Sequence, residues 1–64
     1  MCESNVYFIN GNNKELIMES VDSVESEEGG YRLINIFGKQ KFIKGTIVSL
    51  SLGDHKIFMK KNKG

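Results

Sequence analysis

Short runs of β-branched and aromatic residues alternate with turn residues along the whole 64-residue chain. Residues 6–9 (Val-Tyr-Phe-Ile) predict a first strand, and the Asn-Gly-Asn-Asn sequence at 10–13 predicts a tight hairpin turn. A helix is the alternative for residues 15–21, but this run is short and uncapped, so a strand is favoured. Residues 22–30 are polar and end in a Gly pair, which indicates a solvated loop and a turn. Within them, Val24 is a candidate for the inward-facing residue of a short strand.

The second half of the chain has a clearer alternation of apolar and polar residues. Residues 31–37 are the strongest predicted strand, and their apolar residues on both sides are typical of a central strand. Residues 40–44 and 55–59 show a half-buried pattern, and residues 46–52 alternate almost perfectly. That last alternation predicts three side chains inside the protein, namely Val48, Leu50 and Leu52.

Five or six short strands with a turn every eight to twelve residues indicate an all-β protein. At this length a small SH3-like or OB-like barrel is the economical architecture. We expect a single small β-barrel domain over residues 1–60 and a basic, disordered tail over residues 61–64. So small a domain has marginal stability and is often supported by a metal or by a second copy of the chain. With one cysteine, an internal disulfide is excluded.

The formal net charge of +1 does not suggest a polyanion as partner. Residues 1–30 carry one basic and seven acidic residues, a net −6, whereas residues 31–64 carry eight basic and one acidic, a net +7. Two halves that attract each other during folding explain this split better than a basic binding face does. The chain has no signal peptide and no run of about 20 apolar residues. We therefore expect a cytoplasmic protein without a membrane segment.

Cys2 is the only cysteine and lies one residue from the amino terminus. A thiolate is a soft metal ligand, and the neighbouring backbone nitrogens are further donors. By itself, one cysteine without His or Cys at ligand spacing is more often an ordinary terminal thiol than a ligand. His55, the only histidine, is more readily explained as a surface or hydrogen-bonded strand residue than as a ligand, and Asp54 as the cap of a turn.

Several motifs make the chain resemble the CooT family, small nickel-binding accessory proteins linked to the maturation of carbon monoxide dehydrogenase. These motifs are Met1-Cys2, Val6-Tyr7, residues 33–38 (Leu-Ile-Asn-Ile-Phe-Gly), Gln40-Lys41, Gly45 and His55-Lys56-Ile57. The resemblance implies an SH3-like barrel of five to six short antiparallel strands, a homodimer, and Ni(II) bound through Cys2. It also implies a metallochaperone role with a client apo-metalloenzyme such as carbon monoxide dehydrogenase. Lys39 departs from the family pattern, in which an acidic residue often follows the Phe-Gly pair.

The chemistry of Cys2 depends on whether Met1 is removed. Methionine aminopeptidases generally accept a small second residue, and Cys2 would then offer an amine and a thiolate that close a five-membered chelate ring. Two such termini at a dimer two-fold axis give two sulfurs and two nitrogens, a square-planar set that suits Ni(II) or Cu(II). If Met1 stays, the thiolate and backbone nitrogens remain as a weaker donor set.

Two other functions, catalysis and RNA binding, agree less well with the sequence than nickel binding does. No Ser/His/Asp set, Gly-rich phosphate loop or Cys-His pair is apparent, so an enzyme is not expected. RNA binding is the alternative, since relatives of this kind are also labelled predicted RNA-binding proteins and small β barrels bind single strands with aromatic and basic residues. The candidate residues are Tyr7, Phe8, Tyr31, Phe37, Phe42, Phe58, Lys56, Lys60, Lys61 and Lys63. In so small a domain the Phe residues are more readily explained as core.

Overall fold

A computed structural model of the chain describes residues 3–61, which form six β-strands and no helix. The strands are β1 (Ser4–Asn10), β2 (Asn13–Glu27), β3 (Gly30–Asn35), β4 (Gln40–Ile43), β5 (Gly45–Ser51) and β6 (Lys56–Lys61). The described residues therefore contain no helix that could cross a membrane. The all-β fold predicted from the alternation of apolar and polar residues is confirmed.

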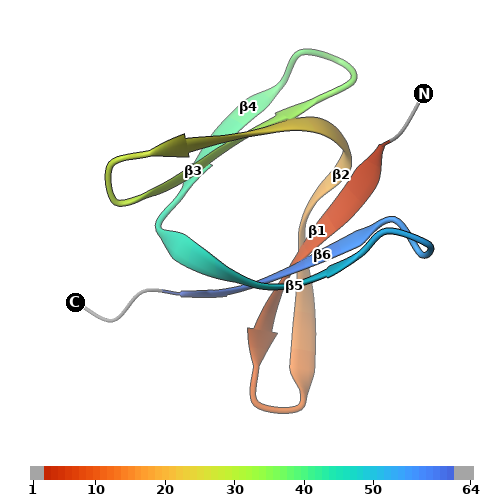
Figure 1. Cartoon of the computed structure of the whole chain (residues 1–64), viewed down its shortest axis with the longest axis vertical. Helices are drawn as coiled ribbons and strands as arrows, with labels where there is room; N and C mark the ends of the chain where they lie inside the picture. Colours follow the sequence, from red (N-terminus) through yellow and green to blue (C-terminus); the bar gives the residue numbers. More distant parts are fainter. Residues whose placement is uncertain (1–2, 62–64) are drawn as a thin grey trace.

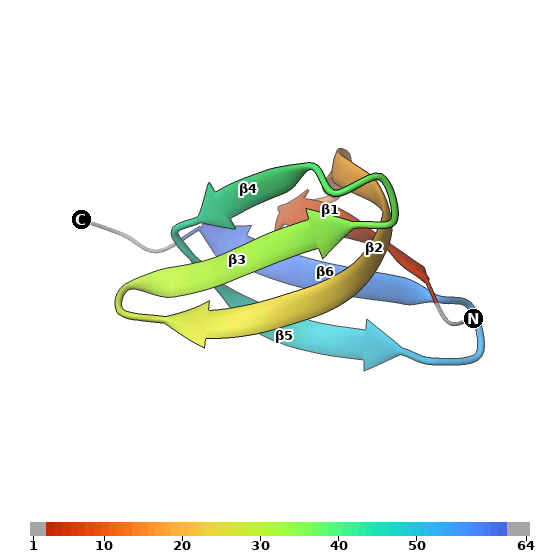
Figure 2. The ribbon, with the colours of Figure 1, turned by 90° about the horizontal axis from the view of Figure 1, so that it is seen from above.

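The six strands form one sheet in the order β4-β3-β2-β1-β6-β5, which curls into a half-barrel (Figures 1 and 2). Most neighbours are antiparallel, as predicted, but β1 and β6 run parallel, with Asn5 opposite Lys56 and Phe8 opposite Met59. This parallel pair joins the first strand of the chain to the last one. The two end strands of the sheet, β4 and β5, do not pair with each other, so the barrel stays open between them.

The expectation of a loop over residues 22–30 is wrong, because β2 continues to Glu27. Its first half pairs with β1 and its second half, from Val21 onward, pairs with β3. One face of this second half is exposed and acidic, whereas Val24 on the other face packs against the core. A strand with one solvated face resembles a loop in sequence when its inward-facing residues are few and small. The turn predicted at the Gly pair is present, with Gly29 at a φ of 85°.

The core is small and lies on the concave side of the curled sheet. Six of the described hydrophobic residues are buried: Val6, Met18, Val21, Leu33, Ile43 and Met59. Leu33, Met59 and Val6 are completely buried, and they come from β3, β6 and β1, strands that are far apart in the sequence. Each of the three therefore holds together parts of the chain that local hairpins do not join.

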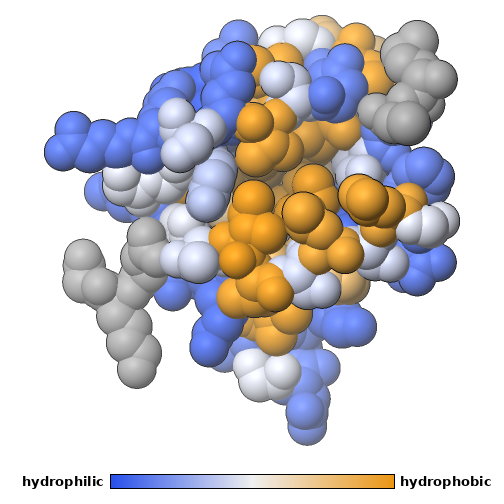
Figure 3. Space-filling view, viewed as in Figure 1, coloured by the Kyte–Doolittle hydropathy of each residue, from blue (hydrophilic) through white to orange (hydrophobic). Residues whose placement is uncertain are grey.

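The prediction that Val48, Leu50 and Leu52 lie inside the protein is wrong, since they are 46%, 57% and 79% exposed. Leu50 is opposite Ile57, which packs against the core, so Leu50 lies on the inner face of β5. It remains exposed because the sheet does not close over this edge strand. We call Val48, Leu50 and Leu52 the β5 patch. Hydrophobic side chains form a band across this face of the molecule (Figure 3).

The last strand begins one residue later than predicted. His55 precedes β6 and has a φ of 55°, a left-handed conformation that does not continue a strand. At its other end β6 extends to Lys61, the first residue of the predicted tail, and residues 62–64 lie outside the described part of the chain.

An ion pair connects the acidic first half of the sequence with the basic second half. Arg32 of β3 donates from Nε to Oε2 of Glu27 at 2.8 Å and from a terminal nitrogen to Oε1 at 3.2 Å. This hydrogen bond, with the charge of the guanidinium, lowers the pKa of Glu27. The pair therefore contributes above the usual pKa of that carboxyl, and its contribution is lost as the pH falls through the lowered value. Because both groups are exposed, the contribution is small.

Candidate functional site

The predicted ligand Cys2 lies outside the described residues, together with Met1. The structure does describe where the segment that follows it enters the fold. β1 begins at Ser4, and Asn5 is already aligned with Lys56 at the start of β6. The beginning of β1 therefore lies beside the turn that joins β5 to β6, at one end of the half-barrel (Figure 2).

Asn5 connects three segments at this end. Its backbone N–H donates to the backbone oxygen of His55 at 2.9 Å. Its side-chain oxygen Oδ1 accepts from the backbone N–H of Ser20 at 3.1 Å. Ser20 lies at the bend of β2, and its own backbone oxygen accepts from Ile36 N at 2.9 Å. The start of β1, the bend of β2 and the turns before β4 and β6 are thus connected by hydrogen bonds of two residues, Asn5 and Ser20.

A shallow hollow beside the start of β1 is lined by Glu3, Asn5, Asp54 and His55. The two carboxylates and the imidazole are all metal-ligand types, and an imidazole suits nickel. However, no three His, Cys, Asp or Glu side chains within residues 3–61 are close enough together to hold a metal ion.

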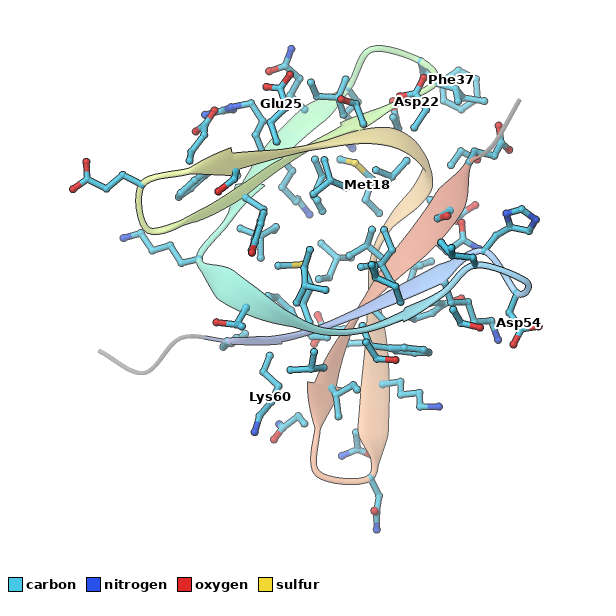
Figure 4. All side chains as sticks on the ribbon, viewed as in Figure 1. Met18, Asp22, Glu25, Phe37, Asp54 and Lys60 are labelled. Atoms are coloured by element: carbon cyan, nitrogen blue, oxygen red, sulfur yellow. The ribbon has the colours of Figure 1, made fainter. Side chains whose placement is uncertain are left out.

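The other candidate residues near this end have local structural roles. Asp54, labelled in Figure 4, accepts a hydrogen bond from the Ser51 hydroxyl at 3.2 Å within the turn, which agrees with its predicted role as a turn cap. His55 is exposed, and its backbone N–H donates to Leu52 O at 3.4 Å. Its backbone contacts belong to the turn and to the pairing with Asn5.

The aromatic side chains are divided among several surfaces. Phe8 and Tyr31 pack against the core, and Phe37 is 82% exposed on the turn that follows β3. Tyr7 and Phe58 stack with ring centroids 5.6 Å apart on the neighbouring strands β1 and β6. Cationic groups lie over three of the rings: Lys14 over Phe58 at 5.0 Å, Arg32 over Phe42 at 5.7 Å and Lys61 over Phe8 at 5.4 Å. This distribution divides the predicted nucleic-acid residues into separate small sites.

Two features of this end were not identified from the sequence. Asn5 belongs to no motif, and a single Asn at the start of a strand gives no signal of its contacts. The β5 patch was identified as apolar but was assigned to the core, because the same alternation serves a core strand and an exposed apolar edge. Leu52 lies in the turn whose His55 bonds Asn5, so the patch extends toward the start of β1.

Comparisons with known proteins agree with this fold and cover nearly the entire chain. The sequence profile of the CO dehydrogenase accessory protein CooT matches residues 1–60. A crystal structure of a protein from Carboxydothermus hydrogenoformans, assigned as CooT, superimposes with a TM-score of 0.92 at 40% identity, covering 97% of this chain and 100% of the other. An uncharacterised protein of Methanocaldococcus jannaschii is 39% identical over 59 residues, covering 92% of this chain and 96% of that protein. A second, from Methanothermobacter thermautotrophicus, is 37% identical over 59 residues, covering 92% and 88%.

The matched region begins at residue 1 and therefore includes Met1 and Cys2, one of the motifs that carry the resemblance. It ends at residue 60, one residue before the end of β6, and so includes five complete strands and nearly all of the sixth. The family is one of accessory proteins, which agrees with the expectation of a protein that is not itself an enzyme. The chain belongs to the CooT family of CO dehydrogenase accessory proteins.

Proposed function

We propose that this protein is a cytoplasmic metallochaperone that binds Ni(II) through Cys2 at a homodimer interface and delivers it to an apo-metalloenzyme such as carbon monoxide dehydrogenase. The observation that carries the proposal is the family match, which includes Cys2 and nearly the whole sheet. Nickel is the cargo in this account, so its ligands have to release it as well as bind it.

The donor chemistry of the amino terminus supports nickel as the metal. After removal of Met1, Cys2 offers an amine and a thiolate, and two chains together offer two nitrogens and two sulfurs. Such a set favours a square-planar ion, which Ni(II) is in strong fields of this kind. Both groups have to lose a proton before they bind, so the affinity for nickel falls as the pH is lowered.

The β5 patch supports a second copy of the chain as the partner. Val48 and Leu50 are 46% and 57% exposed on the end strand β5, and Leu52 is 79% exposed in the turn that follows it. The two polar residues between them, Ser49 and Ser51, carry no charge. A two-fold axis places the same patch of both chains face to face, which an uncharged apolar surface tolerates.

RNA binding has weaker support than nickel binding. Tyr7 and Phe58, with Lys14 above Phe58, form one small stacking site on the sheet. The remaining aromatic candidates lie elsewhere or in the core. Proteins that bind single strands combine several stacking residues along one basic groove, which this distribution does not resemble.

Titration of the untagged protein with Ni(II) tests the proposal. We expect saturation at one nickel ion per two chains, because the four donors of one site come from two termini. Cys2→Ala should weaken nickel binding by at least about 100-fold, since it removes both thiolates of the site. The measurement is isothermal titration calorimetry of both proteins, with circular dichroism to confirm that the variant is folded. Equal nickel affinity in the variant and the wild type would contradict the proposal.

A further inference from the structure

The turn between β3 and β4 carries the most exposed large hydrophobic side chain among residues 3–61. Phe37 is 82% exposed there, and its ring points outward from the turn in Figure 4, where it is labelled. Single exposed apolar residues are common on protein surfaces, so the exposure of Phe37 alone assigns it no role. What distinguishes Phe37 is the set of hydrogen bonds that fixes the turn around it.

Asn35, the last residue of β3, holds this turn with both its side chain and its backbone. Its side-chain oxygen Oδ1 accepts from the backbone N–H of Phe37 at 3.0 Å and from that of Lys39 at 2.9 Å. Its own N–H donates to the backbone oxygen of Lys39 at 2.9 Å, and its carbonyl accepts from Gly38 N at 3.0 Å. Gly38 has a φ of 83°, which favours glycine. The backbone that presents the Phe37 ring is therefore fixed before any partner binds.

Two further apolar side chains make Phe37 part of a small surface. Leu16 of β2 is 44% exposed and lines a shallow hollow together with Phe37. Ile36 is 38% exposed, and its backbone N–H donates to the backbone oxygen of Ser20 at 2.9 Å. An exposed aromatic side chain beside other apolar groups is typical of the residues that contribute most to a protein–protein interface. Because the turn is already fixed, little conformational entropy is lost when it binds.

The charged side chains around this surface are of both signs. The hollow is lined by two lysines and one glutamate, namely Lys39, Lys41 and Glu19. Asp22 adds a second acidic group, since it follows Val21, which is opposite Asn35 in the sheet. Two positive and two negative groups give no net attraction to the phosphates of a nucleic acid or to an anionic membrane. The surface therefore fits another protein, with an apolar pocket for the ring and charges of both signs around it.

We propose that Phe37 is the residue by which this protein docks on its client metalloenzyme, and that its ring inserts into an apolar pocket of that partner. The identity of the partner rests on the proposed function. The docking surface is separate from the β5 patch, because Phe37 lies on the turn before β4, and β4 and β5 are the opposite end strands of the sheet. One surface therefore serves the second copy of the chain, and the other serves the client.

Binding of the untagged protein to nickel-free carbon monoxide dehydrogenase of the same organism, measured by surface plasmon resonance, tests this role. Phe37→Ala should weaken binding by at least about 30-fold, as truncation of a central interface residue commonly does. Its melting temperature and nickel affinity should equal those of the wild type, because the ring is exposed.

Two variants of Asn35 test whether the fixed turn matters. Asn35→Ala keeps the ring but removes the acceptor for two backbone N–H groups, and it should weaken docking by about 3- to 10-fold. Asn35→Asp keeps an oxygen acceptor at the same place and should dock as the wild type does. Circular dichroism confirms that both variants are folded.

Docking of Phe37→Ala with wild-type affinity would overturn the role of Phe37. Phe37-dependent binding to single-stranded RNA or to vesicles of phosphatidylserine and phosphatidylcholine, or a monomeric Phe37→Ala variant, would assign the surface to another occupant and overturn the proposal as well. A wild-type protein that binds Ni(II) but does not dock would overturn the docking proposal alone. A protein that docks through Phe37 but binds no nickel would instead overturn the proposed delivery of nickel.

Discussion

Replacing Leu50 and Leu52 together by lysine is expected to dissociate the homodimer that we propose into monomers. Both side chains are more than half exposed in the single chain, so the substitutions cost little folding stability. In a two-fold interface each substitution occurs twice, which removes four leucines and places four ammonium groups opposite one another. If each leucine contributes roughly 1 kcal/mol when the interface covers it, the loss of dimerisation free energy is about 4 kcal/mol. This corresponds to an increase of about 1,000-fold in the dimer dissociation constant.

Sedimentation equilibrium or light scattering after gel filtration measures this change. Phe37→Lys is the matched control, because Phe37 is 82% exposed and equally apolar but lies on the turn between β3 and β4. We expect Phe37→Lys to remain dimeric and to bind nickel as the wild type does. The double lysine variant should lose the one-per-two stoichiometry along with the dimer. If Phe37→Lys dissociates the dimer and the β5 variant does not, then the assignment of the interface to β5 is wrong.

Leu33→Ala is expected to leave most of the protein unfolded at 25 °C. Leu33 is completely buried in β3, in a core of six buried residues. Truncation of a buried leucine costs about 2 to 5 kcal/mol, and the core of a domain this small supplies only about 3 to 5 kcal/mol in total. One substitution can therefore remove nearly all of the stability of the monomer.

Urea unfolding followed by far-ultraviolet circular dichroism measures this loss. Leu16→Ala serves as the control, because Leu16 is the same residue type but is 44% exposed on β2. It should cost only about 1 kcal/mol, since about half of that side chain remains in water in the folded protein. Comparable losses in the two variants would mean that the buried residues of the sheet do not dominate its stability.

Much of the fold could be predicted because the strand and turn residues of the sequence lie where the sheet has its strands and turns. The hairpin at residues 10–13 and the strand at residues 31–37 combine strong strand residues with turn residues of defined conformation, and both were located within two residues. The boundary of β2 was wrong because Asp22 to Glu27 carry acidic side chains on their solvated face. Only the pairing with β3 makes this segment a strand, and pairing partners are not visible in a local pattern.

The burial of β5 could not be predicted for a different reason. Alternation of Val48, Leu50 and Leu52 with serines defines an apolar face, but whether anything covers that face depends on where the sheet ends. The half-barrel remains open beside β5, so this face is exposed in the single chain. A second chain that covers it would reconcile the sequence pattern with the exposed surface.

In the candidate site, too, some residues can be identified from the sequence and others only from the folded structure. Cys2 stands out in the sequence because a thiol is rare and chemically distinctive, and the family match from residue 1 includes it. Asn5 does not stand out, because its importance comes from the contacts with Ser20 and His55, which lie 15 and 50 residues away in the chain. Only the folded sheet brings Ser20 to the side chain of Asn5 and His55 to its backbone N–H.

Native mass spectrometry of the untagged protein, with and without Ni(II), tests the central claim most directly. The account predicts a dimer of chains that begin at Cys2 and that together carry one nickel ion, with little or no nickel on the monomer. Nickel bound equally well to single chains, or a dimer of such chains that takes up no nickel, would contradict it.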